Sequence, residues 1–511
     1  MKNAWKRAFC QRGRARLLGL LLTGILLATG CTTTKMPLTG IPLPVPDLPF
    51  RLDFWRAHDR DFSDMEWVAS FDAVHDTLVA EYPFTEHKDI RWGALREAYR
   101  PRIVAAVEAE DPAAFYVALR EYVYAVPDGN MGLYDNPEVR EAEIGGGVGF
   151  AVLPLDDGRL IASVVTEEGP AAQAGMAWGA EILGWNDMPA ADAVEMVPVL
   201  WARRPPATDV ARRFEQARFL ARMPAGETVT VTFQNVGEET PKTATLTALD
   251  DDFATLEATY LHDSEVDELE SPMSSEILAN GMGYIRLKFM APTVVMPFPS
   301  QEFRASLTKM KRNNVRGLVL DVRGNTGGTR ELIAKMLGHF FEESMLLEQM
   351  AYYDEESQAW EAVEEGRLEV PPRSPHYGGP LAVLVDYHTV SGGEAMPMVL
   401  KRRSGTVVAG LTGTHGSIAP AGGYIELPND SAAYYPVGRS LNAAGEIQVE
   451  SNAAGEGGVL PDLKVPVNRD TAEAVFAGGE DVVLDEAIEA LEEMAPAPAE
   501  DGAQEGSPEA R

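Results

Sequence analysis

A serine followed by two glycines stands where a buried strand is expected to end. The segment TVSGGE (389–394) follows the apolar run 380–385 and precedes a second apolar run, 395–400. Nucleophilic serines are often mounted on such a turn between a strand and a helix. Ser391 is therefore a candidate nucleophile, and it needs a group to accept its proton. The alternative is a turn serine without a catalytic role.

A second turn with bare backbone amides follows the apolar run 315–322. In LVLDVRGNTGG (318–328), Gly327 and Gly328 leave their amides free of neighbouring side chains at the end of a strand. Acyl transfer needs such donors aimed at the developing oxyanion, so this turn and Ser391 together predict an oxyanion hole. The side chains expected to support the turn, by ion pairing and by capping, are Asp321, Arg323 and Asn325.

The elements that carry these turns alternate between strand and helix. Residues 281–490 contain short apolar runs separated by amphipathic stretches such as 300–312 and 331–342. This alternation predicts an α/β core with parallel strands and flanking helices. Before it, residues 51–128 have apolar residues at helical spacing, with a helix start at Asp111-Pro112. We therefore expect a multidomain α/β (α+β) protein.

Residues 145–250 have a different, strand-rich pattern. The stretch GPAAQAGMAWGAEILGWNDMPA (169–190) resembles the core of a PDZ domain, and GGVGF (146–150) resembles its carboxylate-binding loop. In that fold, loop amides hold a chain-terminal carboxylate while the peptide adds a strand to the sheet edge. The peptide-binding residues that this resemblance implies are Gly147, Val148, Gly149 and Phe150. The segment 201–226 is longer than the fold needs, and we interpret it as an inserted helical segment.

Four separated segments together resemble the C-terminal-processing (tail-specific) and tricorn-type serine proteases. They are PDGN (127–130), the PDZ-like segment, DVRGNTGG (321–328) with TVSGGE, and GEGGVLPDLKV (455–465). The helical stretch 82–99 is also similar, and the resemblance covers about residues 65–490 in the family's order. It implies peptide hydrolysis with Ser391 as nucleophile. It places the oxyanion donors on Gly327 or Gly328 and on Gly392.

The general base departs from the family pattern. One branch of the family uses a lysine about 25 residues after the serine, and the closest residue here is His415, in VVAGLTGTHGS (407–417). The other branch uses a histidine in a DGH motif, where this chain has Asn130. A histidine is a competent base near neutral pH, so we expect His415 to act as the base.

Other polar residues surround the predicted site. Glu394 is expected to fix the turn or orient its neighbours. His388, three residues before Ser391, is a further candidate for the base, but we expect it to face away or cap the turn. Glu450 and Glu456 are both candidates to orient His415, as the third member of a triad does, and the sequence does not rank them.

Composition limits the classes of partner. The net charge of −34 argues against nucleic-acid binding, because no basic surface is available to neutralise phosphates. The histidines show no zinc-binding spacing and there is no phosphate-binding GxxxxGK[ST] motif, so we expect neither a metal nor a cofactor.

The N-terminus has the features of a lipoprotein signal peptide. A basic segment precedes the apolar run 17–27, and small residues then lead to Cys31. Lipidation of Cys31 would anchor the protein in a bacterial cell envelope, facing the periplasm. Thr32 is not the acidic residue associated with inner-membrane retention, which favours the outer membrane. An ordinary secretory signal is the alternative.

The sequence thus predicts a membrane-anchored serine endopeptidase that captures protein substrates through a PDZ-like domain. The alternative is a catalytically impaired relative that acts as a peptide-binding adaptor or scaffold. The expected divisions are a signal peptide (1–31), a Pro-rich tether (32–50), an N-terminal helical domain (51–142), a PDZ-like domain (143–250), an α/β protease core (251–490) and a disordered acidic tail (491–511).

Overall fold

The structure, a computed structural model, describes residues 59–260, 270–354 and 356–494 of the 511-residue chain. The predicted signal peptide, Cys31 and the tether lie outside the described residues, as does the chain after residue 494. Within the described ranges, no helix combines the length and apolar character needed to cross a membrane.

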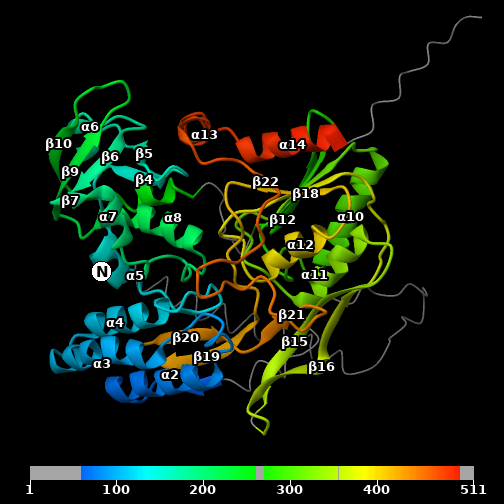
Figure 1. The fold of residues 1–511 in the computed structure, drawn as a ribbon, viewed down its shortest axis with the longest axis horizontal. Coiled ribbons are helices and arrows are strands. Elements are labelled where there is room, and N and C mark those ends of the chain that lie inside the picture. The colour runs from blue at the N-terminus through cyan, green and yellow to red at the C-terminus, as the bar shows by residue number, and fades with distance from the viewer. Residues whose placement is uncertain (1–58, 261–269, 355, 495–511) are drawn as a thin grey trace, which may run out of the picture. The chain divides into compact units, whose positions relative to one another are not determined.

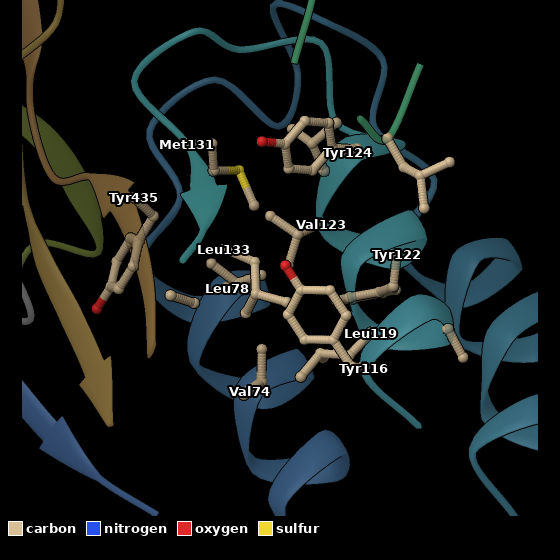
Figure 2. Close-up of a cluster of buried hydrophobic side chains, with 14 of the residues drawn as sticks. Val74, Leu78, Tyr116, Leu119, Tyr122, Val123, Tyr124, Met131, Leu133 and Tyr435 are labelled. Atoms are coloured by element: carbon tan, nitrogen blue, oxygen red, sulfur yellow. The ribbon is translucent and has the colours of Figure 1, made fainter. Parts of the chain in front are cut away.

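Helices form the first part of the described chain. Asp111 caps one of them as predicted, because its Oδ1 accepts hydrogen bonds from the amides of Ala113 and Ala114, each at 3.0 Å. Side chains of the first and third helices pack together with Met131 and Leu133 (Figure 2). The helices are α2 (Trp67–Glu81), α3 (Trp92–Glu108), α4 (Pro112–Tyr124) and α5 (Pro137–Ile144).

A sheet that combines strands from both ends of the described chain packs with these helices. Its strands, in order, are β1 (Asp59–Asp61), β19 (Ala421–Leu427), β20 (Ser431–Pro436) and β2 (Gly132–Leu133). Tyr435 of β20 belongs to the same buried cluster as the helices and is labelled beside them in Figure 2. The chain after residue 410 therefore returns to residues 127–133, and this return assembles the site described below.

The PDZ-like segment forms an antiparallel sheet with β4 at its edge. Its order is β10-β9-β6-β5-β4, and helix α8 packs against β4. Ala217 and Leu220 of α8 belong to the core of this module, and α8 confirms the helix predicted within 201–226. That the segment is an insertion stays a prediction. The larger elements are β4 (Phe150–Pro154), β5 (Leu160–Val165), β6 (Glu181–Trp185), α7 (Ala190–Glu195), α8 (Asp209–Leu220), β9 (Thr228–Gln234) and β10 (Lys242–Thr247).

Short elements border this module. They are β3 (Gly146–Gly147), α6 (Pro170–Gln173), β7 (Met188–Pro189), β8 (Arg222–Met223), β11 (Leu249–Asp250) and α9 (Ala254–Glu257).

The core is a second sheet, ordered β12-β13-β14-β17-β18-β22. Strands β13 to β22 run parallel and β12 is antiparallel, which confirms the predicted α/β class. The strands are β12 (Met273–Ile277), β13 (Gly283–Leu287), β14 (Leu318–Asp321), β17 (Leu381–Leu384), β18 (Thr406–Gly410) and β22 (Leu463–Lys464).

Helices cover both faces of this sheet (Figure 1). Leu318 and Leu320 of β14 face the cluster of α10 (Pro299–Arg312), α11 (Arg330–Leu337) and α12 (Gly392–Leu400). Val319 between them faces α14 (Val482–Met494). Because both faces are covered, β14 and β17 are entirely apolar until their carboxyl ends, where binding sites of parallel sheets form.

The predicted acidic tail begins later than residue 491. Leu491 of α14 is fully buried against the core sheet, so the prediction that residues 491–494 are disordered is wrong. The remaining elements are η2 (Gly338–Phe340), β15 (Met345–Asp354), β16 (Ala359–Val370), β21 (Arg439–Leu441), α13 (Arg469–Ala472) and η3 (Glu473–Ala477).

Candidate active site

Ser391 occupies a strained turn between β17 and α12. Its backbone has φ 57° and ψ −130°, a conformation that residues with a side chain rarely adopt. The turn is held from two sides: the amide of Val390 donates to the carbonyl of Asn325 and the amide of Ser391 to that of Ser417, both at 2.9 Å. The side chain is partly exposed. The fold therefore presents this hydroxyl at the carboxyl edge of the sheet.

The glycine turn after β14 lies directly beside Ser391. A Cβ on Gly327 would come within 3.3 Å of Ser391 Oγ, and one on Gly392 within 3.2 Å of the amide nitrogen of Gly328. The amide of Gly327 already donates to Asn325 Oδ1 at 2.8 Å. Within the described ranges, the amides of Gly328 and Gly392 donate to no protein atom. Of the two predicted alternatives, Gly328 is thus the one that can pair with Gly392 as an oxyanion donor.

Buried polar contacts fix the glycine turn. The guanidinium of Arg323 donates to both oxygens of Asp321, at 3.0 and 2.7 Å, so the expected pair forms. It also bonds Asp481 at 2.7 Å. Asn325 Nδ2 donates to the carbonyl of Leu287 at 2.7 Å, so its side chain holds the turn as expected.

His415 lies on the loop after β18, with its ring against the backbone of Gly129. A Cβ on Gly129 would approach the ring's Nδ1 to 2.8 Å. The imidazole is buried, and its Nδ1 has no hydrogen-bond partner among the described residues. Burial, and after it the positive charges of Arg204 and Lys88, lowers the pKa of His415 to about 3. The ring is therefore neutral near pH 7, the form that can accept a proton.

The loop that carries His415 is fixed to the turn that precedes α12. The amide of His415 donates to the carbonyl of Thr389 at 2.9 Å. Within the described part of the chain, Ser391 Oγ and the His415 ring share no hydrogen bond. The fold thus brings the two residues to the same edge of the sheet.

Glu394 supports that loop from inside the protein. Its carboxylate is fully buried and accepts hydrogen bonds from the hydroxyl of Thr414 at 2.5 Å and the amides of Gly416 and Ser417 at 2.7 and 2.8 Å. Burial raises its pKa to about 7, although these hydrogen bonds lower it. Its position accords with the predicted supporting role.

Asn130, at the position where one branch of the family has a histidine, holds the same loop. Its buried Nδ2 donates to the carbonyl oxygens of Ser417 and Ala419, each at 2.7 Å. The adjacent amide of Gly129 donates to the hydroxyl of Ser417 at 2.8 Å. Both contacts join the PDGN turn to the His415 loop, so Asn130 has a structural position here.

The two glutamates considered as partners of His415 have other contacts. Glu450 Oε1 accepts from the amide of Ala419 at 2.9 Å, and its Oε2 lies 3.2 Å from Lys88 Nζ. Glu456 Oε2 accepts a hydrogen bond from Asn452 Nδ2 at 3.3 Å, and the amide of Glu456 donates one to Asn452 Oδ1 at 3.1 Å. Neither carboxylate forms a hydrogen bond to His415 among the described residues.

A buried charged cluster beneath the loop was not predicted. Lys88 Nζ has no exposed surface and lies near the carboxylates of Glu450 and Asp128, at 3.2 and 3.7 Å. Burial raises the pKa of Glu450. The three residues are far apart in sequence. Each lay in a segment or at a position that the sequence analysis had singled out, but nothing in the sequence indicated that they meet.

The predicted carboxylate-binding loop is buried. Residues 144–151 have little exposed surface, and Gly147 pairs with Arg222 on one side and Leu249 on the other. Gly149 has φ +84° and its backbone lies against Pro170. Val148 and Phe150 are core residues of the module. Peptide binding by these residues stays a prediction.

A polar pocket borders the catalytic turns. Its volume of about 700 Å³ includes space that is open to solvent. Thr326, immediately before Gly327, and His415 line it, as does His388. The His388 ring lies 4.0 Å from the ring of Tyr387, so it forms the wall of the pocket and does not face away. The other lining residues are Arg203, Arg204, Pro206, Ala211, Glu215, Tyr387 and Tyr434.

Comparison with known proteins identifies the core. The sequence model of peptidase family S41 matches residues 281–465, the segment that holds the parallel strands of the core sheet, both turns and His415. Residues 281–465 are a family S41 peptidase domain. The predicted resemblance is thereby confirmed, and the S41 domain makes the protein a serine-type peptidase.

Solved structures agree with the fold around the S41 domain. The chain is similar to mature CPAF complexed with lactacystin, with 12% identity, a TM-score of 0.58, and coverage of 84% of this chain and 99% of that chain. Mature CPAF alone gives 13% identity, a TM-score of 0.57, and coverage of 84% and 98%. At these identities the likeness concerns the fold. No curated protein matches the chain.

Proposed function

We propose that this protein is an endopeptidase in which Ser391 attacks the scissile carbonyl of a bound polypeptide. The observation that carries the proposal is the position of Ser391 Oγ beside the unbonded amides of Gly328 and Gly392. In the reaction, the oxygen of Ser391 bonds to the carbonyl carbon and its proton passes to the ring of His415. The two amides stabilise the oxyanion.

The second half of the reaction uses the same groups. His415 returns the proton to the leaving amine, the carbon–nitrogen bond breaks, and an acyl-enzyme remains on Ser391. Water then attacks the acyl carbon and gives a proton to His415. The bond between that carbon and Ser391 Oγ breaks, His415 passes the proton to Oγ, and the carboxylic acid leaves. The neutral state of His415 supports its role as base. Its lowered pKa makes it a weak base, which favours slow turnover.

The proposal also includes how the protein binds its substrate and where in the cell it lies. β4 is the last strand in the order of the PDZ-like sheet and lies beside α8, and this edge is where a substrate would add a strand. The N-terminal sequence supports a lipid anchor at Cys31 in the bacterial envelope, in the outer membrane, with the enzyme facing the periplasm.

A peptide-binding scaffold is the second candidate function. It is favoured by Asn130, which replaces the family's histidine, and by the missing hydrogen bond between Ser391 and His415. A scaffold would bind peptides at the same surface and leave them intact.

Hydrolysis of an unstructured protein such as casein separates the two functions. We expect the wild type to cleave it, Ser391→Ala to be inactive, and His415→Asn to lose at least about 10²-fold in rate. Ser357→Ala, at an exposed serine outside the site, is the matched control and should keep full activity. Intact casein in all four samples, despite measurable peptide binding, would establish the scaffold.

A further inference from the structure

The pocket beside the catalytic turns carries a positive charge that the proposed reaction does not use. Arg203 and Arg204 both line it. Arg204 Nη1 donates to the carbonyl of Gly129 at 2.9 Å, and Arg204 forms no ion pair with any described carboxylate. Arg203 lies 3.9 Å from the ring of Tyr260 and 3.8 Å from Glu257.

The one acidic residue in the pocket wall is already neutralised. Glu215 accepts two hydrogen bonds from Arg218 Nη1, at 2.8 and 2.9 Å, and a third from the hydroxyl of Tyr387 at 3.1 Å. Glu215 is buried, so its charge is committed to Arg218. Among the described residues, the guanidinium of Arg204 therefore leaves the pocket with an excess of positive charge.

This excess contrasts with the rest of the protein, whose net charge is −34. Exposed carboxylates farther than about 8 Å are largely screened at physiological ionic strength, whereas a half-buried guanidinium is screened much less. A guanidinium is also suited to bidentate binding of a carboxylate. The pocket thus favours an anionic group even though the protein as a whole repels one.

We propose that this pocket is a specificity site for a substrate carboxylate, with Arg204 as its principal ligand and Arg203 in support. The carboxylate is either an Asp or Glu side chain or the free C-terminus of the substrate. The proposal rests on the proposed peptidase function and names the class of substrate that the same site prefers.

Isosteric peptides test the proposal. One pair differs by Glu or Gln at positions flanking the scissile bond, with amidated C-termini, and a second, neutral pair ends in a carboxylate or an amide. We expect the wild type to prefer the charged member of at least one pair by roughly tenfold in kcat/KM, as for a hydrogen bond to a charged group. The pair that is discriminated identifies the source of the carboxylate.

Variants of Arg204 show whether the preference comes from the pocket. Arg204→Gln should reduce the preference to less than about twofold, and Arg204→Lys should retain part of it because the charge remains. The preference is a ratio, so general damage to catalysis does not alter it. Arg91→Gln removes the same charge from a side chain that is 79% exposed, and it should leave the ratio unchanged.

Equal cleavage of both members in both pairs would overturn the proposal, as would an unchanged preference in Arg204→Gln. If the wild type cleaves no peptide, the peptidase function fails, and dissociation constants decide the specificity. A preference for the charged peptide in Ser391→Ala that is lost when Arg204→Gln is added would still support the pocket. Equal binding of both peptides, or none, would overturn it.

Discussion

Glu394 accepts a hydrogen bond from the amide of Ser417 at 2.8 Å, while the carbonyl of Ser417 accepts one from the amide of Ser391 at 2.9 Å. Glu394 therefore joins the turn of the nucleophile to the loop of His415. Since the carboxylate is fully buried, water cannot replace it as the acceptor.

Removal of this carboxylate should loosen the site. Glu394→Ala leaves the amides of Gly416 and Ser417 buried without a partner, at about 1–3 kcal/mol for each group. We expect a loss of about 2–5 kcal/mol in the free energy of unfolding and a fall in kcat larger than any change in KM. Glu394→Gln keeps one acceptor oxygen, so its stability and its kcat should lie between those of the wild type and those of Glu394→Ala. Urea unfolding and steady-state kinetics measure both effects, and an Ala variant with wild-type stability would contradict the assigned role.

Asn130 should resist replacement by its isostere. Asn130→Asp places a carboxylate against the carbonyl oxygens of Ser417 and Ala419, where the amide now donates two hydrogen bonds at 2.7 Å. We expect a loss of roughly 2–4 kcal/mol in the free energy of unfolding at pH 7, because a buried charge loses its partners. The loss should shrink at acidic pH, where the new side chain is protonated. A change below about 0.5 kcal/mol in chemical denaturation would show that Asn130 does not hold the loop.

The sequence predicted those features of the site that lie within one short segment, and it missed those that depend on contacts between distant segments. Ser391 and the glycine turn lie within short segments whose strand and turn signals are strong, and the parallel strands β14 and β17 bring them together. The choice between Gly327 and Gly328 depends on one hydrogen bond to Asn325 Oδ1, which no pattern of residue types specifies. Lys88, Asp128 and Glu450 meet only because the chain returns under the N-terminal helices.

Prediction of the fold was limited in the same way, because local patterns do not show which distant residues pack together. The α/β alternation predicted the core and the helical character of 201–226, but no sequence pattern shows that Ala217 and Leu220 of α8 fill the PDZ-like core. Leu491 likewise belongs to the core although acidic residues surround it.

The neutral His415 should make stability dependent on pH. Its pKa is about 3 in the folded protein, against about 6.5 in an unfolded chain, so below pH 6.5 the unfolded state binds a proton that the folded state does not. The stability that the protein owes to keeping this ring neutral is therefore fully present above pH 6.5, and it is lost as the pH falls toward 3. Relative to His415→Gln, the wild type should lose about 2 kcal/mol between pH 7.5 and pH 5. Parallel losses in both proteins would show that His415 keeps an ordinary pKa.

Lys88 should be essential to the stability of the buried cluster. Lys88→Met leaves the carboxylates of Glu450 and Asp128 without their cation, which should cost about 3–5 kcal/mol in the free energy of unfolding. Adding Glu450→Gln removes one of these charges and should restore part of the loss. Urea unfolding of the single and double variants measures this coupling. Equal stability of Lys88→Met and the wild type would contradict the ion-pair cluster.

The site of fluorophosphonate attachment tests the central claim most directly. The reagent phosphorylates an activated serine and places an oxygen where the oxyanion would lie, so labelling needs both the nucleophile and the amides of Gly328 and Gly392. We predict a single adduct on Ser391 when the labelled protein is mapped by mass spectrometry. The adduct should be absent in Ser391→Ala and form more slowly in His415→Asn. An unlabelled wild-type protein that is folded and binds peptide, or an adduct on another serine, would contradict the account.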